Sequence, residues 1–212
     1  MEFFVEEISK NIPKTVTIVA ATKYFTSSEM RTLFETGIHH FGENRVEPFL
    51  DKINDLSDLN ITWHIIGTLQ TKKVKKIIDK VDYLHSLDNI NLALEINKRR
   101  LVPLKCFIQV NISDEESKHG LNMDQVVPFI QEIKDLKNIE LVGFMGMAEH
   151  TDDEKVIGAS FEKLNHLQTI VLNECGMMLK ELSIGMSNDY LIALKYNATM
   201  LRLGSVLFKK GE

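Results

Sequence analysis

A lysine ends an apolar segment near the start of the chain. In the stretch VAATKYF, which covers residues 19–25, Lys23 is the only charged residue between Lys14 and Glu29. Apolar neighbours disfavour the charged form of a lysine and lower its pKa, so the free amine becomes a nucleophile that can form a Schiff base with a carbonyl group. A lysine just past a strand is usually a solvated loop residue, so the sequence leaves that alternative open beside a partly buried Lys23 capable of this chemistry.

Two glycine-containing turns near the other end of the sequence could hold a phosphate group. GMSND at 185–189 and LRLG at 201–204 offer backbone N–H groups, and the first adds the Ser187 hydroxyl. Arg202 lies alone between two leucines, and a buried guanidinium stays charged and needs a partner. A lysine nucleophile with a phosphate site is typical of pyridoxal 5′-phosphate (PLP) or of a Schiff-base aldolase acting on a phosphorylated sugar. These residues alone leave both alternatives open.

The elements that must position these residues follow an alternating pattern. Short apolar, β-branched runs alternate with longer segments of helical period, and Thr26 and Glu29 have the spacing of a helix capping box before one such segment. The candidate strands are Thr15–Thr22, Ile38–Gly42, Ile61–Gly67, Val81–Ser86, Pro103–Asn111, Ile139–Met147, Leu179–Ser187 and Thr199–Gly204.

Strands that are apolar on both faces and separated by helices indicate a parallel sheet. Eight of them in 212 residues predict an α/β fold, a single-domain (β/α)8 TIM barrel over residues 1–212. An open doubly wound sheet is the alternative, but it would call for a GxGxxG turn after the first strand, and the sequence has none there. In a barrel the functional residues gather at the carboxyl ends of the strands, where Lys23, Ser187, Arg202 and Gly204 fall.

Composition limits the remaining function classes. The formal net charge of -5, from 25 basic and 30 acidic residues, disfavours a nucleic-acid binder, although the TKKVKK run at 71–76 leaves an RNA- or protein-binding face as an alternative to a solvated helix. We find no signal-peptide pattern and no transmembrane run, and the two cysteines lack CxxC spacing, so we expect a cytoplasmic protein without a membrane partner. The histidines are too dispersed to predict a metal site.

Seven ordered blocks carry a family resemblance. VAATK, FGENR, WHIIGTLQ, VNISDEESKHG, GFMGM, LSIGMSNDY and TMLRLGSVLF together resemble the pyridoxal phosphate homeostasis proteins, which are single-domain barrels related to the N-terminal domain of alanine racemase. The resemblance extends from Val16 to Phe208. It implies that Lys23 holds PLP as a Schiff base and that Arg202 faces the pyridine nitrogen. The other cofactor-binding residues that it implies are Ser187, Gly204 and Thr199 at the phosphate, and Asn44, His64, Met145 and Met186 along the pocket.

The same resemblance implies a role in the supply of free cofactor, with no catalytic residue and no strong turnover. PLP and PLP-dependent apoenzymes are the expected partners of a monomer. A permanently charged Arg202 agrees with weak chemistry, because it discourages protonation of the pyridine nitrogen and so weakens the cofactor as an electron sink. The alternative is a PLP-dependent amino-acid racemase or lyase, which would need a second acid or base from Tyr24, His64 or His85.

Overall fold

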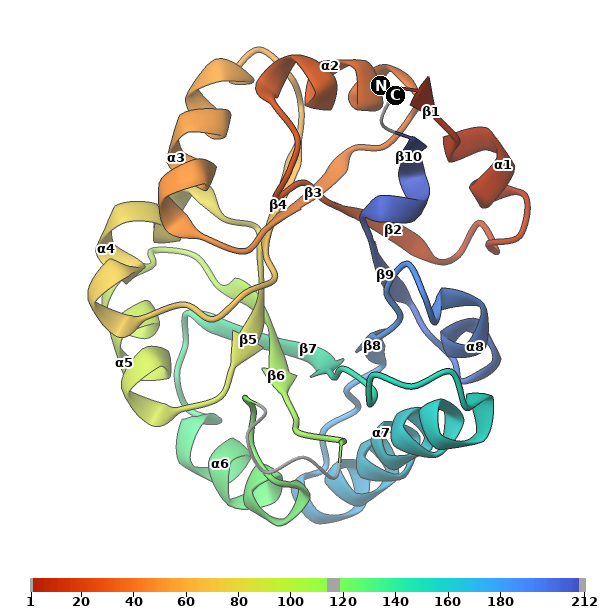
Figure 1. Ribbon diagram of the computed structural model, residues 1–212. Coiled ribbons are helices and arrows are strands. Elements are labelled where there is room, and N and C mark those ends of the chain that lie inside the picture. The colour runs from red at the N-terminus through yellow and green to blue at the C-terminus, as the bar shows by residue number, and fades with distance from the viewer. Residues whose placement is uncertain (1, 114–118, 210–212) are drawn as a thin grey trace.

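Eight parallel strands close into a barrel in the computed structural model, which describes residues 2–113 and 119–209. The strands follow the chain order from β2 to β9, and Figure 1 shows helices forming a ring outside them. The predicted TIM barrel is therefore confirmed, and each predicted strand contains or overlaps an observed one. The barrel strands are β2 (Thr17–Ala21), β3 (His40–Glu43), β4 (Thr62–Ile65), β5 (Tyr83–Leu87), β6 (Leu104–Gln109), β7 (Ile139–Met145), β8 (Glu181–Ser183) and β9 (Met200–Leu203).

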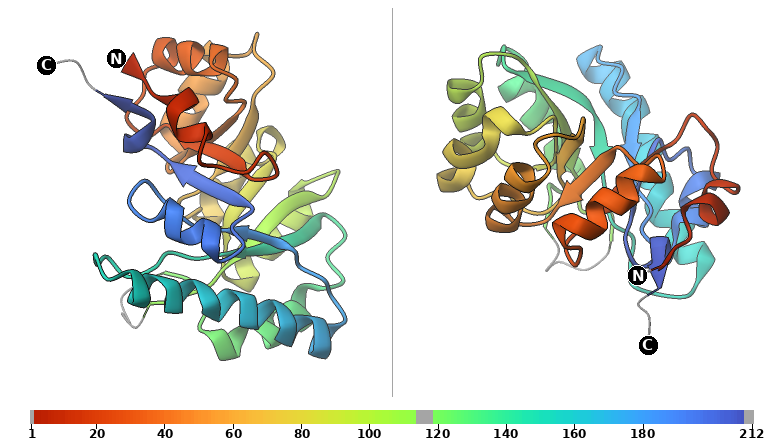
Figure 2. Two further views of the ribbon diagram at one scale, coloured as in Figure 1. Left: turned by 90° about the vertical axis from the view of Figure 1, so that its right-hand side faces the viewer. Right: turned by 90° about the horizontal axis from the view of Figure 1, so that it is seen from above.

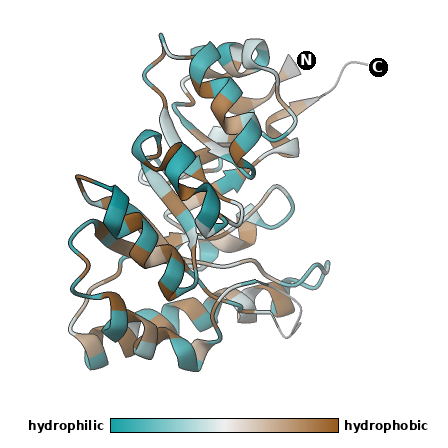
Figure 3. Cartoon of the chain, turned by 90° about the vertical axis from the view of Figure 1, so that its left-hand side faces the viewer, coloured by the Kyte–Doolittle hydropathy of each residue, from teal (hydrophilic) through white to brown (hydrophobic). Residues whose placement is uncertain are grey.

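The helices start and stop where local sequence signals place them. Thr26 and Glu29 form the predicted capping box at the start of α2, and α7 begins after the Asp153 N-cap and ends at Gly176 in the left-handed conformation. Apolar residues such as Leu33 face the sheet, while Figure 3 shows hydrophilic residues along the same helices. The helices are α1 (Val5–Ser9), α2 (Ser27–Glu35), α3 (Val46–Asp55), α4 (Val74–Ile77), α5 (Ile90–Arg99), α6 (Val126–Ile133), α7 (Glu154–Cys175) and α8 (Tyr190–Lys195).

A separate two-stranded sheet joins the two ends of the chain. Antiparallel β1 (Glu2–Phe3) pairs with β10 (Phe208–Lys209), as Figure 2 shows beside the barrel. The Phe25 ring packs edge-on between Phe3 and Phe208, with centroids 6.0 and 4.7 Å away. Since Phe25 lies two residues after Lys23, this sheet anchors the loop that carries the lysine. Sequence patterns did not predict it, because two-residue strands have no measurable periodicity.

The interior of the barrel is partly polar. Val19, Phe107, Met145 and Met200 form a small apolar cluster that is distinct from the larger core shared with the helices. Buried His64, His85, Ser183 and Arg202 also come from barrel strands. Barrels of this type are usually filled by branched aliphatic layers. The polar residues at these positions therefore need hydrogen-bond partners inside the barrel.

Among the described residues, none of the helices has the combination of length and apolar character required to cross a bilayer. Residues 114–118, the DEESK part of the block VNISDEESKHG, lie outside the described residues.

Candidate functional site

A cavity of about 810 Å³ opens where β7, β8 and β9 end; we call it the site cavity. Its walls are the loop from β7 to α7, the loop from β8 to α8, and the end of β9. These are carboxyl ends of strands, where the sequence predicted the site. The predicted site residues that line it are Met186, Ser187, Arg202 and Gly204.

Two backbone N–H groups converge on one oxygen in the site cavity. The Ser187 Oγ accepts hydrogen bonds from the N–H groups of Gly204, at 3.1 Å, and Val206, at 3.3 Å. Gly204 lies between β9 and the short 3-10 helix Ser205–Leu207, and Val206 lies within that helix. Rotation of the Ser187 side chain would free the two N–H groups for the oxygen of an anion. The arrangement therefore fits a phosphate group.

The loop that carries Ser187 is held by a glycine and an aspartate. Gly185 has a φ of +87°, and a Cβ there would lie 2.7 Å from the Cβ of Ala193, so only glycine fits this turn. The carboxylate of Asp189 accepts the N–H of Met186 at 2.5 Å. Burial raises the pKa of Asp189, while the nearby charge of Arg202 opposes that rise.

Arg202 brings a buried positive charge to the wall of the site cavity. Its Nη1 donates to the carbonyl oxygen of Ser183 and, at 2.7 Å, to the Ser183 Oγ; its Nη2 donates to the carbonyl oxygen of Gly146 at 3.0 Å. Burial lowers the pKa of Arg202 to about 10, so the guanidinium stays charged at neutral pH. The partner expected for the buried Arg202 charge is thus a set of carbonyl and hydroxyl oxygens at the ends of β7 and β8.

Lys23 is exposed, which is the solvated-loop alternative that the sequence left open. Its Nζ lies 4.7 Å from the ring centroid of Tyr24, which is itself exposed. The apolar neighbours do not bury Lys23 because the apolar run ends at Thr22 and the chain turns there, with the Phe25 N–H donating to the Thr22 carbonyl at 3.0 Å. Lys23 does not line the site cavity, whereas Ala21 does.

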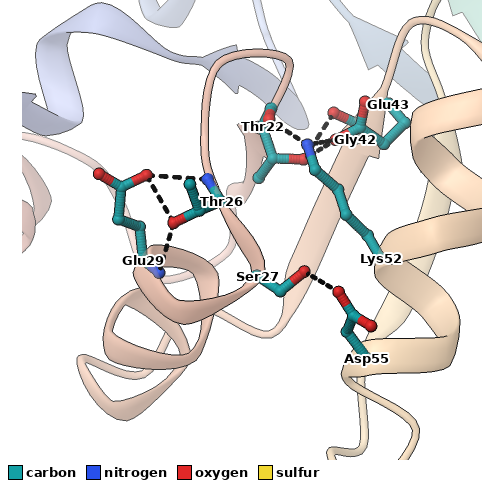
Figure 4. A network of polar contacts seen from close by, with 8 residues as sticks. All are labelled: Thr22, Thr26, Ser27, Glu29, Gly42, Glu43, Lys52 and Asp55. Carbon is teal, nitrogen blue, oxygen red and sulfur yellow. Dashed lines mark hydrogen bonds and ion pairs between the residues drawn. The ribbon is translucent and has the colours of Figure 1, made fainter.

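A buried ion pair fixes the residue before Lys23 (Figure 4). The Lys52 Nζ lies 2.6 Å from both the Glu43 Oε1 and the carbonyl oxygen of Thr22, and the Thr22 hydroxyl also donates to the Glu43 carboxylate. Lys52 comes from α3 and Glu43 ends β3, so three elements meet at this point. This ion pair was not predicted from the sequence. The sequence feature that could have indicated it is the glutamate in FGENR followed by a lysine on the next helix.

Three predicted residues lie elsewhere in the barrel. Asn44 follows β3 and is exposed. Its carbonyl oxygen packs against Gly67, where a Cβ on residue 67 would lie only 2.4 Å from that oxygen. Met145 is buried in the barrel interior. Thr199 lies at the amino end of β9, where its Oγ1 accepts the Leu182 N–H, and it lines a second cavity of about 470 Å³. The structure does not bring these residues to the site cavity, and their part in cofactor binding stays a prediction.

Three of the histidines that are dispersed in the sequence, His40, His64 and His85, form a hydrogen-bonded chain inside the barrel. His40 Nδ1 lies 2.9 Å from His64 Nε2, His64 Nδ1 lies 2.8 Å from His85 Nε2, and His85 Nδ1 lies 2.8 Å from the Ser183 Oγ. Burial lowers the pKa of His64 and of His85 well below 6.5. Predicted as a pocket residue, His64 is instead fully buried behind the cavity wall. Among the described residues, no group of three or more His, Cys, Asp or Glu could hold a metal.

Comparisons with known proteins show the family of the chain. The family model described as the alanine racemase N-terminal domain matches residues 5–210. A pyridoxal phosphate homeostasis protein of Aquifex aeolicus is 35% identical over 194 residues, which cover 90% of this chain and 85% of the relative. Another from Synechocystis is 32% identical over 207 residues, covering 95% and 94%. The chain belongs to the pyridoxal phosphate homeostasis protein family.

Solved structures extend this family assignment. PipY of Synechococcus elongatus, solved without PLP, superposes with a TM-score of 0.90 at 27% identity, covering 97% of this chain and 98% of that one. The same protein with PLP bound gives 0.88 at 26% identity, with the same coverage. An alanine racemase of Clostridium difficile, at 15% identity and a TM-score of 0.79, is matched over 56% of its length and shares the fold.

Removing one partner of the buried ion pair should strongly destabilise this family member. Replacing Lys52 by Met leaves the Glu43 carboxylate buried without its cation, so we expect Lys52→Met to lower the free energy of unfolding by about 3–5 kcal/mol in urea titrations. The matched control is Lys73→Met, which breaks the exposed pair with Glu47; the side chains are 31% and 57% exposed there, against 10% and 2% for Lys52 and Glu43. Equal effects of the two substitutions would contradict a structural role for the buried pair.

The neutral histidines should make folding sensitive to acid. The folded-state pKa values of His64 and His85 lie below the ordinary 6.5, so their contribution is fully present above that pH and is lost as the pH falls. Two such groups predict that the free energy of unfolding declines below pH 6.5 toward a limiting slope of about 2.7 kcal/mol per pH unit. Urea titrations at several pH values measure it, with His39→Leu as the exposed-histidine control. A free energy that stays constant down to about pH 5.5 would contradict the burial of uncharged imidazoles.

Proposed function

We propose that this chain binds PLP in the site cavity and takes part in the intracellular homeostasis of that cofactor. The observation that carries the proposal is the convergence of the Gly204 and Val206 N–H groups beside the buried charge of Arg202. The first could bind the phosphate, and the second could donate a hydrogen bond to the pyridine nitrogen. The names of the relatives and the PLP-bound structure of PipY support the same cofactor.

Lys23 is the residue that we propose for covalent attachment of the cofactor. Its primary amine would condense with the PLP aldehyde and release one molecule of water. Strand pairing supports this position, because β2 pairs with β9 through Ala20 and Leu203, so the loop after β2 begins beside Gly204. The Lys52–Glu43 pair fixes the Thr22 carbonyl, and the exposed lysine side chain is accessible to an incoming ligand.

Arg202 also supports a carrier rather than a strong catalyst. PLP stabilises a carbanion on the substrate best when its pyridine nitrogen is protonated. A guanidinium can donate a hydrogen bond to that nitrogen but cannot supply a carboxylate partner for its protonated form. We therefore propose no strong turnover, and we propose a cytoplasmic monomer whose partners are PLP and PLP-dependent apoenzymes. The free thiols of Cys106 and Cys175 support a reducing compartment.

Reductive trapping tests the attachment site. After incubation with PLP and sodium borohydride, we expect mass spectrometry of peptides to find the reduced adduct on Lys23, and we expect Lys23→Ala to lose it. Lys14→Ala, which removes an exposed lysine before β2, is the matched control and should keep the adduct. An adduct spread over several surface lysines, unchanged in Lys23→Ala, would contradict a specific site.

Exchange of the amino-acid α-proton tests the absence of strong turnover. We expect holoprotein in deuterated water to incorporate deuterium into alanine, and into other small amino acids, no faster than free PLP does, as followed by proton NMR. A bona fide alanine racemase serves as the positive control. Sustained exchange at enzyme-like rates that is lost in Lys23→Ala would favour the racemase or lyase alternative.

A further inference from the structure

A continuous hydrogen-bonded chain crosses the barrel behind the site cavity. It begins at half-buried His40, the first residue of β3, and passes through His64 on β4 and His85 on β5 to Ser183 on β8. Ser183 then contacts Arg202 on β9, the last member, which lines the site cavity. We call these five residues the histidine chain. Of its members only Arg202 faces the cavity, so any effect of the histidines on a ligand must pass through it.

Arg202 sets the direction of the first hydrogen bond in the histidine chain, and one simple pattern of tautomers completes the rest. A guanidinium has only donors, so the Ser183 Oγ accepts from it, and the simplest complete pattern has the Ser183 hydroxyl donate to His85 Nδ1. His85 then carries its proton on Nε2 and donates to His64 Nδ1, and His64 donates from Nε2 to His40 Nδ1. All three imidazoles are neutral in this pattern.

The rings of the histidine chain are also held in place by packing. Tyr83 stacks on His64 with a centroid distance of 4.5 Å and an interplanar angle of 6°, and Phe107 stacks on His85 at 4.5 Å and 29°. Burial and the charge of Arg202 both keep His85 uncharged. A ring fixed in position and tautomer can fix the hydroxyl that bonds to it.

We propose that His64 and His85 are positioning residues that act through Ser183 to aim the Arg202 guanidinium at a ligand in the site cavity. Nη1 is committed to Ser183 and one N–H of Nη2 to Gly146, which leaves the remaining N–H groups for a ring nitrogen. The ligand identity rests on the proposed function. The positioning itself is a property of the free protein and can be measured without any ligand.

NMR of the free protein tests the positioning directly. We expect the imidazole 15N shifts of His64 and His85 to report neutral Nε2–H tautomers, and the Arg202 side-chain signals to report slow rotation of the guanidinium. His64→Leu interrupts the chain without touching Arg202 and should speed that rotation. His64→Gln should restore the slow rotation, because its amide can accept from His85 and donate to His40. His39→Leu, which replaces an exposed histidine next to the chain, is the matched control.

Ligand binding gives the second measurement. Pyridoxine 5′-phosphate, which has no aldehyde and cannot react with Lys23, is the probe. We expect His64→Leu to weaken its binding about ten-fold in calorimetric titrations, His64→Gln to restore most of it, and His39→Leu to leave it unchanged. If His64→Leu does not fold, Ser183→Ala removes the link next to Arg202 and should produce the same loss.

The outcomes separate this inference from the proposed function. Unchanged Arg202 rotation and unchanged binding in folded His64→Leu would overturn the positioning role while the cofactor site stands. A wild-type protein that binds neither pyridoxine 5′-phosphate nor PLP would overturn the proposed function. The predicted NMR changes in His64→Leu would still support the positioning of Arg202 in that case.

Discussion

The buried positive charge of Arg202 is the constraint on which much of the barrel interior depends. A guanidinium taken out of water must be surrounded by acceptors, and here carbonyl and hydroxyl oxygens at the ends of β7 and β8 provide them. One of these acceptors is the Ser183 hydroxyl, which needs a hydrogen-bond partner of its own. His85 is that partner, and His64 is in turn hydrogen-bonded to His85 inside the barrel. Interior positions that are aliphatic in many barrels are polar here at His64, His85, Ser183 and Arg202.

The other half of the site depends on a second buried charge pair. Glu43 and Lys52 hold the chain where β2 ends, while the β1–β10 sheet and the Phe25 ring hold it on the other side of the lysine loop. Lys23 is thereby exposed on a loop whose two ends are fixed. The turn after β9, the Arg202 guanidinium and the loop that carries Lys23 all lie at the carboxyl ends of strands, as barrel topology requires.

The sequence was sufficient to predict the barrel and several residues that line the site cavity. Strand positions followed from apolar runs, and Ser187, Arg202 and Gly204 followed from glycine turns and an arginine isolated among leucines. The sequence left open whether Lys23 is exposed or buried, because the flanking apolar residues do not show where the chain turns. The histidine chain was missed for a related reason, since residues separated by about twenty positions meet only through strand register. The feature of the sequence that could have indicated the histidine chain is that His40, His64 and His85 lie on three successive strands.

We propose that the phosphate of PLP binds at the turn after β9, beside Arg202. Titration of 15N-labelled protein with PLP, followed through the backbone amide signals, is the decisive measurement. We expect the signals of Gly204 and Val206 to move most strongly, because both N–H groups exchange the Ser187 hydroxyl for a charged phosphate oxygen. Amide signals that stay in place at Gly204 and Val206 while PLP binds elsewhere on the protein would contradict it.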